Sequence, residues 1–278
     1  PGPIGFKNTD AFLEYHYIAN ALNTYNWEIS NYHYSLPPSW YIIRKNKNKF
    51  FYQNKHNKLK HWHPIVVTGN NLWNDYKIVT SFIIENHDGR NGIIFRYQND
   101  RCYYFAGSNN GKFSIIKVEH EKAFRVPDET IFYMDSTLLP VNKKINITIK
   151  AIKNNIICYY LNKKIKVTDS TYKTGKIGLL SDSPSFFGKI KVKTNLKSYY
   201  NLKKKEHTLE KETKELSSRN PVMVLWKKIN VKGFGTGRNL RFGDLDNDGK
   251  IDILIGQVIN HGPKDRNSEL SCITAINL

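Results

Sequence analysis

Cysteines and long apolar runs are both scarce in this sequence of 278 residues. The three cysteines, Cys102, Cys158 and Cys272, are too few and too scattered to form a disulfide framework. Cys102 and Cys158 fall in strand-like runs, where buried free thiols are expected, although a disulfide between the two stays open. No apolar run approaches the ~20 residues needed to cross a bilayer, so we expect no membrane span.

Acidic residues are outnumbered: 43 lysines and arginines face 24 aspartates and glutamates, which gives a net charge of +19. A charge of this size predicts attraction to polyanions such as nucleic acid, an acidic polysaccharide or an anionic surface. A lysine- and asparagine-rich composition without such a partner explains the same numbers, and both interpretations stay open. Hydrophobic residues make up 40% of the chain and aromatics 13%, enough for a substantial core.

Helical periodicity is missing from residues 73–192. Short runs such as GIIFRYQ, CYYFAGS and INITIKAI alternate in period two and are separated by Asn, Asp and Gly. This pattern, rich in Ile, Val, Tyr, Phe and Thr, indicates antiparallel strands. Many such strands at short spacing favour a two-sheet sandwich or barrel over a parallel α/β sheet. We therefore predict an all-β fold with a central β-sandwich.

A basic stretch interleaved with aromatics precedes this block. Residues 44–63 contain seven lysines or arginines and no acidic residue, together with Phe50, Phe51, Tyr52 and Trp62. Such a combination stacks bases and grips phosphates. Aromatic faces also pack on sugar rings while cations meet carboxylates or sulfates. In a strand, alternate residues of the run would simply belong to core and surface, and this interpretation also stays open.

Other segments indicate how the chain is organised. Residues 39–53 predict a hairpin, and residues 119–141 a long loop at the sandwich edge that could carry binding residues. Residues 203–219 change to helix formers of alternating charge, typical of a solvated connector. The chain starts without Met or a leader and stops directly after a strand-like run, which suggests processing or truncation. The predicted domains are a sandwich at 1–197, a helical linker at 198–220 and a further unit at 221–278.

The clearest chemical motif lies in the last of these units. It is D-x-D-x-D-G-x-x-D, formed by Asp244, Asp246, Asp248, Gly249 and Asp252. Alternating carboxylates on a tight loop can converge on one hard cation, and oxygen ligands favour Ca²⁺. The twelfth loop position is Ile255, not the Glu of an EF-hand, and a strand-like run follows. We therefore expect Ca²⁺ to join two strands here; an unoccupied Asp-rich turn is the alternative.

Two family resemblances follow from these segments. The strand pattern from WNDYKIVTSFII to FGKIKV resembles the concanavalin A-like (LamG-type) jelly roll, particularly the 3-keto-disaccharide hydrolase-like domains of bacterial glycan-degrading proteins. The segment VLWKKINVKGFGTGRNLRFGDLDNDGKIDILIGQ resembles an FG-GAP/VCBS-type β-propeller blade like those of rhamnogalacturonan lyases. The second resemblance implies Ca²⁺ at Asp244, Asp246, Asp248 and Asp252. A propeller needs several blades and this chain has about one, so a truncated propeller is expected.

The resemblances imply a carbohydrate-recognition portion of a secreted, periplasmic or cell-surface polysaccharide-degrading protein, with an acidic glycan as partner. If Phe95 lies in the core, strand alternation turns Arg96 outward, and the same logic separates Tyr104 from Phe105. We expect glycan contacts at Arg96 and Tyr104, and also at Trp73 and His87.

Two alternatives stay open for this function. One is a lyase or glycoside hydrolase with its site on the sandwich, where His87, Arg96, Tyr103 or Tyr104 would act as base or neutraliser. The other is binding of nucleic acid through charge alone, which is disfavoured because no RNP-like or helix-turn-helix signature occurs.

Overall fold

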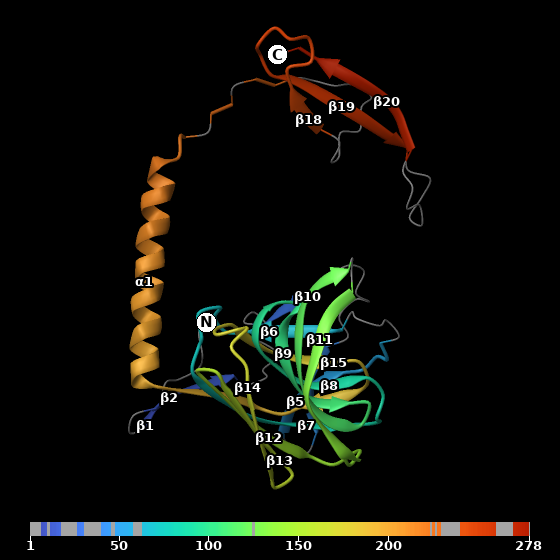
Figure 1. Ribbon diagram of the computed structural model, residues 1–278, viewed down its shortest axis with the longest axis vertical. Helices are drawn as coiled ribbons and strands as arrows, with labels where there is room; N and C mark the ends of the chain where they lie inside the picture. Colours follow the sequence, from blue (N-terminus) through green and yellow to red (C-terminus); the bar gives the residue numbers. More distant parts are fainter. Residues whose placement is uncertain are drawn as a thin grey trace. The chain divides into compact units, whose positions relative to one another are not determined.

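The computed structural model shows a mostly β protein with one long helix (Figure 1). The structure describes residues 7–9, 12–17, 27–30, 40–45, 48–57, 63–123, 126–222, 224–225, 227–228, 240–259 and 269–277. The chain divides into two compact units, Pro1–Ser217 and Ser218–Leu278. The domain limits given from the sequence stay predictions. In the described part of the chain, no helix is long and apolar enough to cross a membrane.

Two antiparallel sheets form the first unit. The ten-stranded sheet contains β1 (Lys7–Thr9), β2 (Phe12–Tyr17), β4 (Trp40–Lys45), β5 (Asn48–Gln53), β7 (Tyr76–Ile84), β12 (Ile145–Ile152), β13 (Asn155–Tyr160), β14 (Lys163–Thr168), β16 (Ser185–Phe187) and β17 (Ile190–Asn195). The seven-stranded sheet contains β3 (Glu28–Ser30), β6 (Ile65–Thr68), β8 (Arg90–Asn99), β9 (Cys102–Asn109), β10 (Lys112–Ala123), β11 (Val126–Leu138) and β15 (Lys176–Ser181). The predicted sandwich is confirmed.

One apolar cluster joins the inner faces of the two sheets. Ile78 and Phe82 from the ten-stranded sheet meet Phe95 and Phe113 from the seven-stranded sheet, and all four are fully buried. The alternation that predicted strands explains this core, because every second residue of β12 is buried. The Cys158 thiol lies in the same cluster, and Cys102 and Cys158 are both free, as predicted.

The seven-stranded sheet is buried on its other face as well. Ile94, Phe105 and Leu180, which alternate with the core residues of their strands, belong to a second apolar cluster and are fully buried. Strands buried on both faces carry apolar residues in both phases, as β8 and β9 do. The outer face of the ten-stranded sheet is different, because it carries partly exposed lysines.

The prediction of a long loop at residues 119–141 was wrong. Most of this stretch belongs to a long hairpin in which β10 and β11 pair with several register shifts. Charged residues occupy both phases of β11, so no clear alternation appears in the sequence. Because β11 is an edge strand, its Pro127 is tolerated there.

The helix α1 (Leu196–Arg219) follows β17 directly. The side chain of Asn195 caps it by accepting a hydrogen bond from the Ser198 N–H at 2.8 Å. Ser198 and Leu202 are the buried residues of the helix, Leu196, Tyr199 and Glu206 are partly exposed, and the other positions are exposed and mostly polar. The predicted solvated helix is confirmed, and only its first turns pack on the sandwich.

The second unit contains one three-stranded antiparallel sheet, formed by β18 (Leu240–Gly243), β19 (Asp252–Ile259) and β20 (Glu269–Ile276). Several apolar side chains of this unit are exposed, including Phe242 at 68% and Ile251 at 62%. The described residues form one small sheet and show no propeller.

Candidate functional site

Arg96 does not project outward, and this part of the prediction was wrong. Its side chain is 0% exposed, and its backbone φ of 48° places it at an irregular step of β8. The step turns the guanidinium into the end of the sandwich, where Nη1 donates to the Tyr172 carbonyl at 2.9 Å and Nη2 to the Lys153 carbonyl at 2.6 Å. Arg96 therefore joins a strand of one sheet to the β12–β13 turn of the other.

Tyr104 is also fully buried. Its ring stacks on Phe95 with centroids 5.4 Å apart, and its hydroxyl donates to the Asp169 carboxylate. Burial and this hydrogen bond raise the pKa of the Tyr104 phenol. Burial alone would raise the pKa of Asp169, but hydrogen bonds from Tyr104 and Thr171 lower it below its ordinary value. The pair anchors the loop after β14 to β9.

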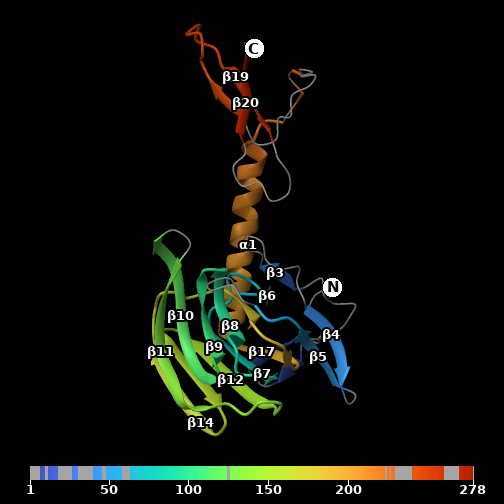
Figure 2. The same cartoon turned by 90° about the vertical axis from the view of Figure 1, so that its right-hand side faces the viewer.

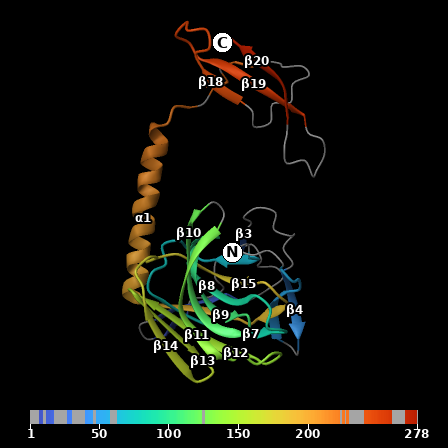
Figure 3. The ribbon, with the colours of Figure 1, turned by 45° about the vertical axis from the view of Figure 1, so that its right-hand side comes forward.

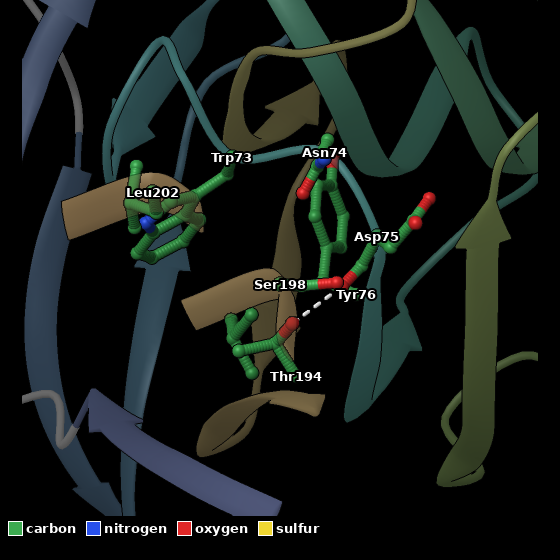
Figure 4. Close-up of a pocket in the computed structure, with 8 residues that line it drawn as sticks. Trp73, Asn74, Asp75, Tyr76, Thr194, Ser198 and Leu202 are labelled. Atoms are coloured by element: carbon green, nitrogen blue, oxygen red, sulfur yellow. Dashed lines mark hydrogen bonds between the residues drawn. The ribbon is translucent and has the colours of Figure 1, made fainter. Parts of the chain in front are cut away.

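Trp73 anchors the first turns of α1. It is 8% exposed and lies beside Leu202 of the helix (Figure 4). Together with Ser198 and Thr194 they line a cavity of about 20 Å³, which holds about one water molecule. Thr194 Oγ1 donates to the carbonyl of Asp75, which also lines the cavity, at 2.6 Å (Figure 4). The space is too small for a sugar ring.

His87 has an internal partner as well. Its Nε2 donates to the Leu139 carbonyl at 2.9 Å, which connects the β7–β8 turn to the end of β11. The four residues expected to contact a glycan are thus all held by internal contacts. As glycan contacts they stay predictions, and their geometry supports structural roles.

The sequence missed a row of lysines across the outer face of the ten-stranded sheet. In the strand pairing, Lys77 of β7 stands opposite Lys193 of β17 and opposite Lys150 of β12. All three side chains are partly exposed. On β2, Glu14 stands opposite Lys193. Within the described residues, Lys77 and Lys150 make no ion pair.

A second row lies two residues further along these strands. It contains, from β17 to β14, Lys191, Val79, Thr148, Tyr159 and Lys164. The Nζ atoms of Lys150 and Lys164 lie 5.3 and 6.0 Å from the Tyr159 ring centroid. The first row thus has three lysines side by side, and the second has a lysine at each end with neutral side chains between them. We call the two rows together the lysine face.

An open hollow of about 410 Å³ borders the lysine face at the start of β7. Lys77, Lys150 and Lys193 line it, together with the neutral side chains of Thr194 and Asn195 and the Asp75 carboxylate. One oxygen of Asp75 accepts a hydrogen bond from the Lys153 N–H at 2.6 Å. The hollow thus combines cations with groups that hydrogen-bond to hydroxyls.

The acidic loop of the second unit joins β18 to β19, two strands, as predicted. Its carboxylates from Asp244, Asp246 and Asp252 each offer an oxygen within 4.8 Å of the others, so the group could bind a metal. Gly249 has a φ of 83°, the left-handed conformation that the tight turn needs. The fourth predicted ligand, Asp248, is not in this group, and its carboxylate pairs with Lys250 at 3.0 Å.

Asp252 provides a test of whether this group fits a cation. The residue is 3% exposed, and its Oδ2 accepts the Leu245 N–H at 3.0 Å. Its Oδ1 is buried and has no hydrogen-bond partner in the part of the chain that the structure describes. A buried carboxylate oxygen without a partner is strongly unfavourable, and a bound cation would satisfy it. The oxygen-only ligand set suits a hard cation.

No protein-family model matches the sequence, and no curated protein matches it. Among solved structures, the sandwich is similar to the carbohydrate-binding module CBM66 from Bacillus subtilis, with a TM-score of 0.46 and 18% identity over 60% of this chain and 94% of that chain. A galectin-like protein of unknown function from Bacillus subtilis gives a TM-score of 0.42 and 10% identity over 68% and 97%. Alginate lyase A1-II′ gives 0.40 and 8% over 62% and 96%. At these values the similarity concerns the arrangement of the strands.

Proposed function

We propose that the sandwich recognises an acidic glycan on the lysine face. The observation that carries this proposal is the in-register pair of Lys77 and Lys150, which make no ion pair within the described residues; Lys193 stands next in the same row. Like charges directly opposite each other in a sheet are destabilising, and neighbouring strands are only about 4.8 Å apart. A linear polyanion with closely spaced carboxylates or sulfates would remove this repulsion.

The hollow beside the row favours a glycan over a nucleic acid. Charge alone attracts either polymer. The Asp75 carboxylate would repel a continuous run of phosphates, whereas Asp75, Thr194 and Asn195 together offer acceptors and donors for sugar hydroxyls. A glycan with both charged groups and free hydroxyls suits this combination.

The lyase alternative has less support from the geometry. A catalytic base must be reachable by substrate and have a pKa near the working pH. Tyr103 and Tyr104 are almost fully buried, and burial raises the pKa of both phenols. Arg96 is held by two backbone carbonyls. We therefore favour recognition over catalysis for this unit.

For the second unit we propose a Ca²⁺ site at Asp244, Asp246 and Asp252, in a blade-like sheet of the propeller type. Support comes from the strand–loop–strand connection and the unpartnered oxygen of Asp252. The exposed apolar side chains of the sheet are consistent with packing against further blades. The same proposal includes export from the cytoplasm, because Ca²⁺ is plentiful outside the cytoplasm and scarce within it.

Binding to a panel of acidic and neutral polysaccharides tests the glycan proposal. Polygalacturonate, alginate, hyaluronan and heparin would be compared with neutral dextran, at low and high salt. We expect at least one acidic polymer to bind, more weakly at high salt, and dextran not to bind. Failure of every acidic polymer to bind the intact chain would overturn the proposal.

A charge-matched pair of variants locates the site. The face variant combines Lys77→Gln, Lys150→Gln and Lys193→Gln, and the control combines Lys204→Gln, Lys211→Gln and Lys214→Gln on exposed positions of α1. Each variant removes three charges. We expect the face variant to weaken binding by about thirtyfold, from roughly 0.7 kcal/mol per lysine, and the control by less than about threefold. Equal losses would show that net charge, and not this face, governs binding.

A further inference from the structure

An aromatic row continues the outer face of the ten-stranded sheet beyond the lysines. In the strand pairing, Tyr41 of β4 stands opposite Tyr52 of β5, Tyr52 stands opposite Phe186 of β16, and Phe186 stands opposite Ile83 of β7. Residues opposite each other share one face of a sheet. Three aromatic side chains on adjacent strands therefore lie on one surface, which we call the aromatic platform.

The rings of the platform are ordered against each other and open to solvent at one side. Tyr52 stacks on Phe186 with centroids 4.4 Å apart and planes inclined by 28°, and Phe50 meets Phe186 edge-on at 6.0 Å. Phe186, on which Tyr52 stacks, is 7% exposed, whereas Tyr41 is 50% exposed. Tyr52 is partly exposed between them. Exposure of the rings to solvent therefore increases along the row from Phe186 to Tyr41.

The alternation of the strands separates this surface from the core. Phe51 and Phe187, the neighbours of Tyr52 and Phe186 in sequence, belong to the cluster between the sheets. Tyr52 and Phe186 must therefore point away from that core. The same alternation on β7 places Lys77 and Ile83 on one face, so the platform and the lysine face lie on the same face of the ten-stranded sheet.

The distance between the two parts follows from β7. The six steps from Lys77 to Ile83 span about 20 Å at the rise of a strand. In Figure 2, β4 and β14 lie on opposite sides of the sandwich, with β7 between them. A ligand that contacts both parts must therefore be an extended polymer of several residues.

The chemistry of the platform suits the apolar face of a sugar ring. The C–H groups of a pyranose pack on aromatic faces, and Tyr supplies both a ring and a polar tip. The Tyr52 hydroxyl lies 3.5 Å from Glu85 Oε2, and this carboxylate can accept hydrogen bonds from sugar hydroxyls. A polyanion without rings, such as polyphosphate, would gain nothing from Tyr52.

We propose that Tyr52 and Tyr41, with the buried Phe186 packed behind Tyr52, form a sugar-stacking subsite of the acidic-glycan site. The inference rests on the proposed function: the lysine face holds the charges of the polymer, and the platform holds one of its rings about 20 Å away along β7. The lysine face alone would accept any polyanion, so the platform is what selects a polysaccharide. It also sets a minimum length for a ligand that binds fully.

The test compares two polymers on one set of variants. The polysaccharide that binds most tightly in the panel and inorganic polyphosphate are titrated against the intact chain, Tyr52→Ala, Tyr52→Phe and Tyr200→Ala. Tyr200 is a matched control, because it is 65% exposed on α1. We expect Tyr52→Ala to weaken polysaccharide binding by about tenfold and to leave polyphosphate binding within twofold. Tyr52→Phe, which keeps the ring, should retain most of the affinity, and Tyr200→Ala all of it.

Each other outcome has a distinct meaning. If the intact chain binds polysaccharide and Tyr52→Ala binds it equally well, the platform is not a subsite, and the proposed function stands. If Tyr52→Ala weakens both polymers equally, the substitution has disturbed the fold and the stacking inference is overturned. A dimer in sedimentation that Tyr52→Ala converts to monomer, without any change in glycan affinity, would make the platform an interface between copies and would also overturn it.

Discussion

Replacement of Arg96 by Met tests whether the hydrogen bonds of this buried side chain stabilise the sandwich. Met keeps the buried stem and removes the guanidinium, which donates to the Tyr172 and Lys153 carbonyls. Hydrogen bonds from a charged group contribute about 1.5–3 kcal/mol each, so the two together amount to roughly 3–6 kcal/mol. Removal of a buried charge returns part of this, because the Nε of Arg96 has no partner among the described residues. We expect the free energy of unfolding to fall by about 3 kcal/mol.

Urea denaturation of the intact chain, followed by tryptophan fluorescence, measures this change. Arg44→Met is the matched control, because Arg44 is exposed on β4, and it should change the stability by less than about 0.5 kcal/mol. The midpoint of the sandwich transition should move to lower urea with an unchanged slope. If Arg96→Met lowers the free energy of unfolding by less than about 1 kcal/mol, the stabilising role is refuted and Arg96 is again a candidate for binding.

The remaining predictions concern two carboxylates. Ca²⁺ at 100 times its dissociation constant should raise the free energy of unfolding of the second unit by about 2.7 kcal/mol. Asp252→Asn should abolish both this stabilisation and the calorimetric signal of Ca²⁺ binding. If Ca²⁺ leaves the stability of the intact chain unchanged, the proposed site is contradicted. Hydrogen bonds from Lys163 and Tyr160 hold the pKa of Asp135 below its ordinary value, so its stabilisation is complete above about pH 4 and is lost as the pH falls further. Asp135→Asn should therefore flatten the acid limb of stability against pH, and an unchanged limb would contradict the role of this cluster.

Much of the fold follows from the sequence because period-two alternation survives wherever one face of a strand is buried. The hairpin at 39–53 and the strands β7, β12 and β13 were predicted for this reason, whereas the polar helix was predicted from its helix-forming residues and alternating charges. The same reasoning explains the error at the end of β10 and along β11, which form a long hairpin (Figure 3). An edge strand with charged residues in both phases carries no alternation to detect.

The candidate site was harder to predict, because it depends on register and on local irregularity. The lysines of KIVTSF, TIKAI and KIKVKT are visible in the sequence, but nothing there says that Lys77, Lys150 and Lys193 stand opposite each other. Arg96 shows the reverse difficulty, since one irregular step with a φ of 48° moved its side chain from the predicted surface to the interior. The basic and aromatic run at 44–63 contains Tyr52, on which the proposed stacking subsite depends, and Trp62 of the same run lies outside the described residues.

The placement of the lysines bears on whether the charge of +19 has a function. A composition bias alone would leave lysines wherever repulsion is smallest, among acids and in water. The helix α1 follows that rule, since Lys203 pairs with Glu206 at 2.7 Å and charges of both signs alternate along it. On β7 and β12 the rule is broken, because Lys77 and Lys150 stand opposite each other, only partly exposed, and make no ion pair within the described residues. A destabilising arrangement on the same sheet face as an aromatic platform is difficult to explain by composition and is expected of a surface that binds a polyanion.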